Sequence, residues 1–338
     1  MKSLIIKIYT ALGLHHIWQP IKLFKPAHQC AKTLHSRGLG KTLPLTFDIV
    51  KSNVLYGASI EDYVAMEFHR KSHRERNRFV TFSRNFIYFF KKLYVPEKVD
   101  FFDKKENFNP LFKEYIKHDW LYSAEKSIDD ILMFINKHKS VMVKPTDGCE
   151  GIGVFMLNAD DKEGVENLVN DIKHGKAYMI EQLIIQHDDM ARLNPASVNT
   201  IRIETVVDHD GKPHVTNTIV IMGAGDACVN NTHHGGIMCH IDPASGIIDS
   251  YAHDPQGQCL FRHPVNGIVL PGYQIPNWDG IIDYAKQLAL VEPDCRLIGW
   301  DIVITPDGYD IIEGNVRPGH CTQACDGVGR YQLIKNMI

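Results

Sequence analysis

The chain has 338 residues, with 37 Lys and Arg against 40 Asp and Glu, so its net charge is −3 at pH 7 with His neutral. This length can hold one large domain or two to three smaller ones, and the composition is that of a soluble globular protein. A charge so close to neutral argues against a nucleic-acid partner. The cysteines are scattered without a CxxC pair and no secretion signal is evident, so we expect free thiols in a reducing cytoplasm.

The first 47 residues contain Lys and Arg but no acidic residue, interleaved with apolar side chains. The apolar run is too short and too interrupted to span a bilayer, and no clear small-residue cleavage site follows it. Two interpretations stay open. A basic amphipathic segment can lie on an anionic membrane surface, here through residues 1–25, peripheral to the inner face of the membrane. Alternatively, its apolar stripe packs on the rest of the protein.

Residues 58–121 predict a mainly helical region, because apolar side chains recur there at roughly helical spacing. The charged run 70–76 is typical of a solvated face, and binding of an anionic substrate is the less common alternative. Ser127 followed by Asp130 forms a capping box, which predicts a helix that continues to about Lys137.

The pattern changes at 140–157, where a short apolar strand ends in Lys144 and is followed by a glycine-rich loop and a second strand. Glycines 148, 151 and 153 let the backbone turn and point N–H groups at an anion. The loop lacks the G-K-[ST] ending of a Walker A motif, and a strand rather than a helix follows it. A lysine at the strand end favours phosphate binding, because an ammonium group can meet phosphate oxygens.

Two further strands carry charged side chains. Residues 177–184 predict a strand containing Glu181, which could contact an adenine edge or could simply be an edge-strand glutamate. Residues 199–207 predict a strand on which Arg202 and Glu204 share one face.

The chain then returns through a strand at 215–222 into a polar loop, 225–236, and a hairpin at 237–251. A polar loop between strands is a candidate site. His233 and His234 in this loop could do acid–base chemistry, although loop histidines are more often only solvated.

Two apolar runs within 300–315 flank the sequence Thr-Pro-Asp-Gly, which predicts a hairpin turn. Asp301 lies in the first run, and Glu313 and Asn315 share a face of the second. A bulge or a five-residue loop would place Asp301 opposite Glu313, whereas a strict register would place them on opposite faces. In the bulged register, two carboxylates and an amide oxygen would converge as ligands suited to Mg²⁺. Ordinary solvent-facing acids are the alternative.

Taken in order, these motifs resemble the ATP-grasp superfamily, and in particular its sugar-transfer-associated branch of alpha-L-glutamate ligase-like proteins. The resemblance covers roughly residues 100–325 and rests on the motifs, not on composition. The residues that carry it are Lys144–Pro145, Gly148, Gly151–Ile152–Gly153, Glu181–Gln182, Asn199–Thr200–Ile201–Arg202, Asn231, Gly235–Gly236, Gly299–Trp300–Asp301 and Ile312–Glu313–Gly314–Asn315.

The resemblance implies an α+β fold, with two α+β subdomains gripping ATP and a mainly helical N-terminal domain. The implied bounds are 1–112 for the helical domain and 113–338 for the ATP-grasp domain. Within the latter, 139–186 would be the glycine-loop subdomain and 187–338 the metal and substrate subdomain.

The same resemblance implies the cofactors ATP and Mg²⁺ and a set of site residues. The implied nucleotide-binding residues are Lys104, Lys144, Gly148, Gly151, Gly153, Glu181, Gln182, Leu183 and Asp189. The implied magnesium ligands are Asp301, Glu313 and Asn315. The implied catalytic residues are Arg202 and Arg317, and the implied substrate-binding residues are Asn231, His234, Gly235, Arg317 and His320. Lys144 would contact the α- and β-phosphates and Glu181 the adenine amino group, while Lys105 competes with Lys104 for the role of first phosphate lysine.

The implied activity is an ATP-dependent carboxylate–amine ligase that acts through an acylphosphate. It would join an amino acid or amino sugar to a small-molecule carboxylate in capsule or surface-polysaccharide biosynthesis. The alternative is a kinase that phosphorylates a sugar or glycan hydroxyl on the same scaffold. A regulatory module that binds nucleotide without turnover is a third hypothesis, and the full metal-ligand set argues against it.

Overall fold

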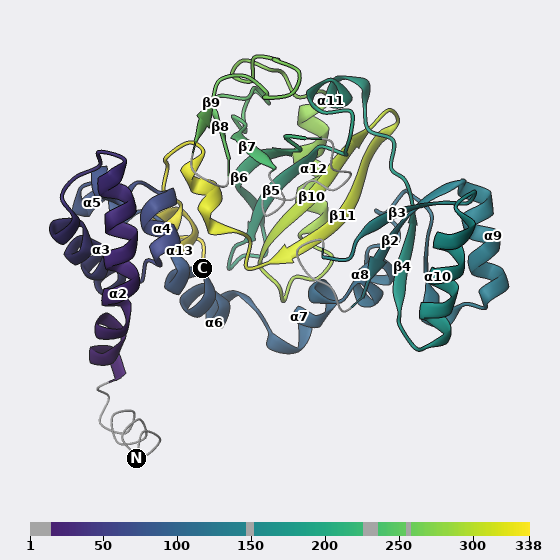
Figure 1. Ribbon diagram of the computed structural model, residues 1–338, viewed down its shortest axis with the longest axis horizontal. Helices are drawn as coiled ribbons and strands as arrows, with labels where there is room; N and C mark the ends of the chain where they lie inside the picture. Colours follow the sequence, from purple (N-terminus) through teal and green to yellow (C-terminus); the bar gives the residue numbers. More distant parts are fainter. Residues whose placement is uncertain (1–14, 147–151, 226–235, 255–257) are drawn as a thin grey trace. The chain divides into compact units, whose positions relative to one another are not determined.

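A computed structural model describes residues 15–146, 152–225, 236–254 and 258–338, with side chains described from residue 22 onward. The chain divides into two compact units. The first comprises Met1–Lys91 and Gly327–Gln332, and the second comprises Lys92–Asp326 and Leu333–Ile338 (Figure 1). The resemblance implied domains at 1–112 and 113–338. Those bounds describe functional domains, not compact units, and they stay a prediction.

The first unit is helical, as the sequence predicts. Its elements are α2 (His15–Ser36), α3 (Thr42–Tyr56), α4 (Ile60–Ala65), η1 (Phe68–Arg70), α5 (His73–Arg76) and the π-helical turn η2 (Arg84–Phe89). Helix α3 ends at Gly57, whose φ of 67° is left-handed and whose Cβ, if present, would lie 2.4 Å from that of Ser83. Glycine is therefore required at this turn.

An ion pair fastens the core of this unit. Two nitrogens of Arg76 donate to the Asp48 carboxylate at 2.7 and 2.8 Å, and the Tyr63 hydroxyl donates to the same carboxylate at 2.6 Å. Burial works against the charged form of Asp48, but Arg76 and Tyr63 lower the pKa of this carboxyl. Arg76, from the charged run 70–76, thus serves the packing of the unit and does not lie on a solvated face.

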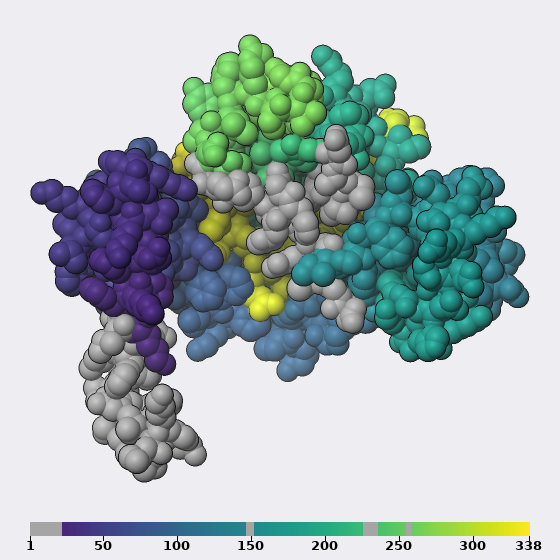
Figure 2. Space-filling model, viewed as in Figure 1, coloured from purple at the N-terminus to yellow at the C-terminus, as the bar shows by residue number. Residues whose placement is uncertain are grey.

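The second unit contains two antiparallel sheets. The four-stranded sheet has the order β1-β4-β2-β3, with β1 (Trp120–Tyr122), β4 (Tyr178–Gln182), β2 (Ser140–Pro145) and β3 (Phe155–Asn158). Helices α9 (Ile128–His138) and α10 (Lys162–Lys173) pack their apolar residues on one face of it (Figure 1). The predicted capping box is present, since the Ser127 side chain accepts from the Asp130 backbone and Asp130 returns the contact. Together these elements form a rounded lobe, coloured teal in Figure 2.

The seven-stranded sheet has the order β11-β10-β5-β6-β7-β8-β9. Its strands are β5 (Thr200–Val207), β6 (Pro213–Met222), β7 (Ile237–His240), β8 (Ala252–His253), β9 (Cys259–Leu260), β10 (Leu297–Thr305) and β11 (Gly308–Val316). The remaining helices of the unit are α6 (Phe90–Leu93), which begins in the first unit, α7 (Pro96–Asp103), α8 (Lys105–Leu111), α11 (Asp188–Leu193) and α12 (Trp278–Leu288). Two short 3₁₀ turns, η3 (Ser123–Glu125) and η5 (His320–Ala324), and the C-terminal α13 (Tyr331–Lys335) complete the described elements.

The central strands β10 and β5 are almost wholly buried, because residues such as Trp300, Ile302 and Ile203 face other layers of the unit. The Trp300 indole N–H donates to Thr205 Oγ1 at 2.8 Å, so even this buried polar group has a partner. A rigid sheet of this kind can hold side chains of its open face in fixed positions. No described helix is long and apolar enough to cross a membrane.

Candidate nucleotide and metal site

The acidic hairpin adopts the bulged register. Thr305 pairs with Gly308 and Ile302 with Ile311, but Asp301 pairs with Glu313, because the register shifts between Asp301 and Ile302. This shift places Asp301 and Glu313 side by side on one face. The sequence left two registers open, and the structure confirms the one that brings the acids together.

Asn315 completes the cluster. Its Nδ2 lies 3.2 Å from Glu313 Oε1 and 3.4 Å from Asp301 Oδ2, and its Cα partner across the hairpin is Gly299. Two carboxylates and one amide from adjacent strands therefore converge, and the amide nitrogen faces both carboxylates. Such a set of hard oxygen donors is what Mg²⁺ prefers in proteins.

The charge balance of this cluster also fits a cation. Burial and the neighbouring Asp301 raise the pKa of Glu313, although Arg202, Lys105 and Lys144 oppose the rise. A carboxyl crowded by a second carboxylate is stabilised as an anion once a cation binds between them. The residues present thus fit a magnesium ion.

Arg202 contacts this cluster from strand β5. Its Nε and Nη2 donate to the two oxygens of Asp301 at 2.7 and 2.6 Å, a bidentate geometry. Burial acts against its charge, but Asp301 raises the pKa of the guanidinium. The strand register produces this contact, since Arg202 is the direct neighbour of Asp301 across the β5–β10 ladder.

Lys144 and Glu181 form a second cluster on the four-stranded sheet. The Lys144 ammonium group contacts the Glu181 carboxylate, and both side chains are largely buried, at 14% and 6% exposure. Burial alone would raise the pKa of Glu181, but Lys144 and His118 lower it to about 2. The charge of Lys144 also opposes the raised pKa of Glu313, so it acts on both clusters.

Only part of the predicted phosphate loop is described. Gly153 has a φ of +75°, a left-handed conformation that L side chains rarely adopt, and a Cβ there would lie 3.0 Å from Pro145 Cγ. Gly148 and Gly151 lie outside the described residues. The predicted substrate residues Asn231, His234 and Gly235 also lie outside them.

The two candidate phosphate lysines at the start of α8 differ in their surroundings. Lys104 Nζ lies 2.6 Å from Asp100 Oδ2, with both side chains about half exposed, at 49% and 60%. Lys105 is instead one of the groups whose charge lowers the pKa of Glu313. Lys105 is also less exposed than Lys104, and the choice of Lys104 as the first phosphate lysine stays a prediction.

The other predicted nucleotide residues follow β4. The Gln182 side-chain oxygen accepts from the Asp119 backbone N–H at 3.1 Å, while its own backbone N–H donates to Asp119 O. Leu183 is half-buried just after the strand. Asp189 lies in the first turn of α11, 48% exposed, with Oδ1 3.6 Å from Arg192 Nη1. Gln182 is thus tied to the sheet, whereas Asp189 is open to solvent.

The predicted substrate residues Arg317 and His320 directly follow β11, the second strand of the acidic hairpin, which we also call the metal hairpin. Arg317 has a φ of 54°, and strain of this kind in a non-glycine residue is often found at functional sites. Its backbone N–H donates to the Tyr94 hydroxyl at 2.8 Å, and its Nη2 lies 3.4 Å from Asp103 Oδ2. His320 begins η5 and is half-buried.

The strand registers reveal a polar row that sequence analysis missed. Arg202 pairs with Ile219 and Glu204 with Asn217, while Ile219 pairs with His240, so these side chains share the face of Asp301. Glu204 Oε1 accepts from Asn217 Nδ2 at 3.1 Å and from Thr322 Oγ1 at 2.9 Å. The alternation along β6 could have indicated Asn217, but nothing local shows which strand lies beside it.

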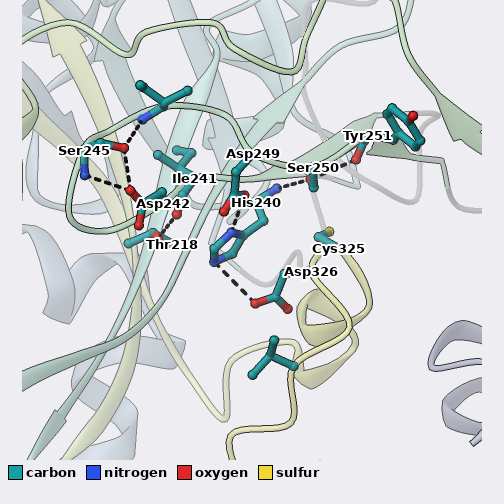
Figure 3. Close-up of polar contacts among 12 residues, drawn as sticks. Thr218, His240, Ile241, Asp242, Ser245, Asp249, Ser250, Tyr251, Cys325 and Asp326 are labelled. Carbon is teal, nitrogen blue, oxygen red and sulfur yellow. Dashed lines mark hydrogen bonds and ion pairs between the residues drawn. The ribbon is translucent and has the colours of Figure 1, made fainter.

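His240 ends this row. Its Nδ1 lies 2.6 Å from Asp249 Oδ1 and its Nε2 3.6 Å from Asp326 Oδ2 (Figure 3). Its backbone N–H donates to Ser250 Oγ at 2.8 Å. The imidazole thus joins β7 to the segment that follows η5, beyond the metal hairpin.

The sequence profile of a family described as sugar-transfer associated ATP-grasp matches residues 84–337, about three quarters of the chain. The chain belongs to this family. Its α+β architecture with a helical N-terminal region agrees with the fold implied by the sequence motifs. No curated protein sequence matches it.

Several solved structures are similar over part of their length. D-alanyl-alanine synthetase A from Vibrio cholerae matches with a TM-score of 0.45 and 11% identity, over 72% of this chain and 67% of that one. The ATP-grasp ligase PsnB with its minimal precursor matches with a TM-score of 0.42 and 14% identity, over 69% and 62%. D-alanine–D-alanine ligase from Bacillus anthracis matches with a TM-score of 0.40 and 14% identity, over 70% and 65%. All three scores are below 0.5, so the residue roles below rest on the geometry of this chain and on its family.

Proposed function

We propose that this protein is an ATP-dependent ligase that joins a small-molecule carboxylate to an amine through an acylphosphate, in the assembly of a capsule or surface polysaccharide. The amine would belong to an amino acid or an amino sugar. The observation that carries the proposal is the convergence of Asp301, Glu313 and Asn315 on one face, with the charge of Lys144 acting on the same cluster.

In this proposal the two clusters bind one ATP molecule. Lys144, with Lys105 or Lys104, contacts the phosphates, the loop containing Gly148, Gly151 and Gly153 covers them, and Glu181 accepts from the adenine amino group. Gln182, Leu183 and Asp189 complete the nucleoside end. Asp301, Glu313 and Asn315 hold Mg²⁺, which when bound neutralises charge on the phosphate oxygens and orients them.

The chemistry needs positioning and charge stabilisation more than a protein nucleophile. The substrate carboxylate oxygen forms a bond to the γ-phosphorus while the bond to the β–γ bridging oxygen breaks, and ADP leaves. The amine nitrogen then attacks the acyl carbon, loses a proton, and inorganic phosphate leaves. Arg202 faces the transferred phosphoryl group, where a guanidinium stabilises the oxygens that gain negative charge.

The carboxylate substrate needs its own binding residues, apart from Arg202. Arg317 and His320 follow the metal hairpin directly, and a planar guanidinium suits a bidentate carboxylate. We assign these two residues to the carboxylate substrate. The loop residues Asn231, His234 and Gly235 remain assigned to substrate on the family resemblance alone.

The direct test measures ADP and inorganic phosphate in parallel, over a panel of amino acids and nucleotide-linked uronates, with magnesium present. A ligase releases both products in equal amounts, and their release depends on the amine. ADP formation without phosphate release would instead support the kinase alternative, in which a hydroxyl keeps the phosphoryl group. Nucleotide binding without any turnover over the whole panel would favour a regulatory module.

We further propose that the helical unit holds the enzyme at an anionic membrane surface, with residues 1–25 and helix α3 in contact with lipid. Leu43, Phe47 and Val54 fall on one face of α3 and are 58%, 62% and 60% exposed, opposite the buried stripe of the same helix. The unit holds 16 Lys and Arg against 5 Asp and Glu, whereas the other unit holds 21 against 35. Exposed apolar side chains on a positively charged unit suit anionic lipid.

Flotation with vesicles tests this contact. The full chain should bind vesicles that contain phosphatidylglycerol better than vesicles of phosphatidylcholine alone, and salt should weaken the binding. The double variant Leu43→Ser/Phe47→Ser and a chain lacking residues 1–20 should each bind less. Met133→Ser is the matched control, since Met133 is equally exposed, at 62%, on the other unit. Binding that is unchanged in both variants would exclude this surface.

A further inference from the structure

His118 lies in the short segment before β1 and is 8% exposed. Its Nδ1 lies 2.8 Å from Asp310 Oδ2, and its Nε2 lies 3.5 Å from Glu181 Oε2. Glu181 belongs to β4 of the four-stranded sheet and Asp310 to β11 of the seven-stranded sheet. The imidazole therefore bridges the proposed adenine acid and the strand that carries Glu313.

Asp310 is held rigidly on its side of this bridge. Its carboxylate accepts from the backbone N–H groups of Lys117 and His118, both at 3.0 Å, and of Ile311 at 2.8 Å, and it is 2% exposed. A carboxylate bound by three backbone donors is fixed in orientation. The Nδ1–H of His118 therefore has a fixed acceptor, which also fixes the plane of the ring.

Both ring nitrogens of His118 face a carboxylate, and only the imidazolium can donate from both. Burial alone would lower the pKa of His118, but the contacts with Asp310 and Glu181 raise it to about 9. His118 is therefore charged at neutral pH, and it helps to keep Glu181 fully ionised.

Lys144 also contacts Glu181, but its proposed role lies elsewhere. Once a nucleotide is bound, Lys144 faces the phosphates and can no longer be the principal partner of Glu181. His118 has no such second role in the proposal, since its Nδ1 is hydrogen-bonded to Asp310 and its Nε2 lies 3.5 Å from Glu181 Oε2, without a hydrogen-bond partner among the described residues. It is thus the cation that remains with Glu181 in the loaded site.

We propose that His118 is a positioning residue that sets the base selectivity of the nucleotide site, by holding Glu181 as an ionised acceptor for a purine 6-amino group. An ionised carboxylate can only accept hydrogen bonds, so it pairs with the 6-amino group of adenine and repels the 6-oxo group of hypoxanthine. This inference rests on the proposed nucleotide site. The new point is that His118, which would not contact the base itself, determines through Glu181 which base the site prefers.

The test measures the affinities for ADP and for IDP by calorimetry, with magnesium at pH 7.5. ADP carries a 6-amino group on its purine, whereas IDP carries a 6-oxo group there. The wild-type chain should prefer ADP, and His118→Gln should reduce that preference roughly tenfold or more, as expected for the loss of a charge-assisted contact. The loss should lie almost entirely in ADP affinity, with IDP affinity nearly unchanged. A merely structural role would weaken both nucleotides equally, and that result would overturn the inference.

His138→Gln is the matched control. The His138 side chain is 8% exposed, against 4% for that of His118, and its Nε2 lies 3.1 Å from the Asp119 carboxylate in the same part of the unit, but no contact of it with Glu181 is found among the described residues. It should keep the ADP preference of the wild type. A loss as large as that of His118→Gln would mean that any buried histidine here has this effect, and would overturn the inference.

A second variant covers the case in which His118→Gln does not fold by circular dichroism. Glu181→Gln leaves the His118–Asp310 contact in place and gives the site a side chain that can donate as well as accept, so it should also lose the ADP preference. If it keeps the full preference, Glu181 does not select the base and the inference fails. Failure of the wild-type chain to bind either nucleotide would instead count against the proposed function.

Discussion

The described residues include two bidentate arginine–aspartate pairs with nearly equal geometry and different surroundings. In the helical unit, Arg76 holds Asp48 at 2.7 and 2.8 Å, and Tyr63, Ser52 and the Lys71 carbonyl supply further contacts. In the other unit, Arg202 holds Asp301 at 2.7 and 2.6 Å.

The difference lies in what surrounds each pair. Beside Arg202 and Asp301 lies a second acid, Glu313, with an amide but with no cation of its own in direct contact among the described residues. The first pair is neutral and closed, whereas the second leaves a negative charge uncompensated. Surplus charge of one sign in a partly buried cluster marks a binding site better than an ion pair alone.

The largest effect should come from removing that surplus charge. Glu313→Gln keeps the shape of the side chain but weakens magnesium binding, and we expect turnover to fall by about a thousandfold, because metal-assisted charge stabilisation dominates phosphoryl transfer. Thermal unfolding should change little. ADP release at saturating magnesium measures the first quantity, and turnover close to the wild-type rate would place the metal elsewhere.

Breaking the closed pair should affect stability and leave the chemistry alone. Asp48→Asn leaves Arg76 without its counter-ion in a partly buried setting, and we expect the free energy of unfolding to fall by about 2–4 kcal/mol. Urea unfolding followed by circular dichroism measures this loss. Turnover per folded molecule should stay at the wild-type level, and a selective loss of activity would contradict the structural role of this pair.

The proposed phosphate lysine should give a smaller effect. Lys144→Ala removes one charge-assisted contact to the nucleotide, so we expect ATP affinity to fall by about ten- to a hundredfold by calorimetry. Glu181 keeps His118 as a partner in this variant, so the fold should be retained. Unchanged affinity would exclude the phosphate role of Lys144. Lys137→Ala, which removes an exposed lysine from its contact with Asp119, provides the control.

The last expected effect depends on pH. Because folding raises the pKa of His118 from its ordinary value near 6.5 to about 9, its charged contacts stabilise the fold fully below pH 6.5, and this stabilisation disappears as pH rises through 9. The difference in unfolding free energy between wild type and His118→Gln should therefore shrink over that range, by about 3 kcal/mol at most. A difference that grows with pH would show that His118 is neutral in the folded protein.

Local sequence patterns predicted several features of the second unit. The Thr-Pro-Asp-Gly turn, the capping box at Ser127 and the strand that ends in Lys144 depend on neighbouring residues, and all three are present. The choice of Lys104 over Lys105 stays a prediction, because adjacent residues at a helix start point in different directions and no local pattern decides between them.

By itself the sequence determined the elements, their order and the residue types of the site, because turns, caps and alternation are set by interactions over a few residues. Only the tertiary structure decided the register that pairs Asp301 with Glu313, since a single bulged residue, invisible to periodicity, moves a side chain from one face to the other. It alone also brought His118 to Asp310, across 192 residues of chain. Contacts of that range depend on how the sheets pack, and no local pattern encodes them.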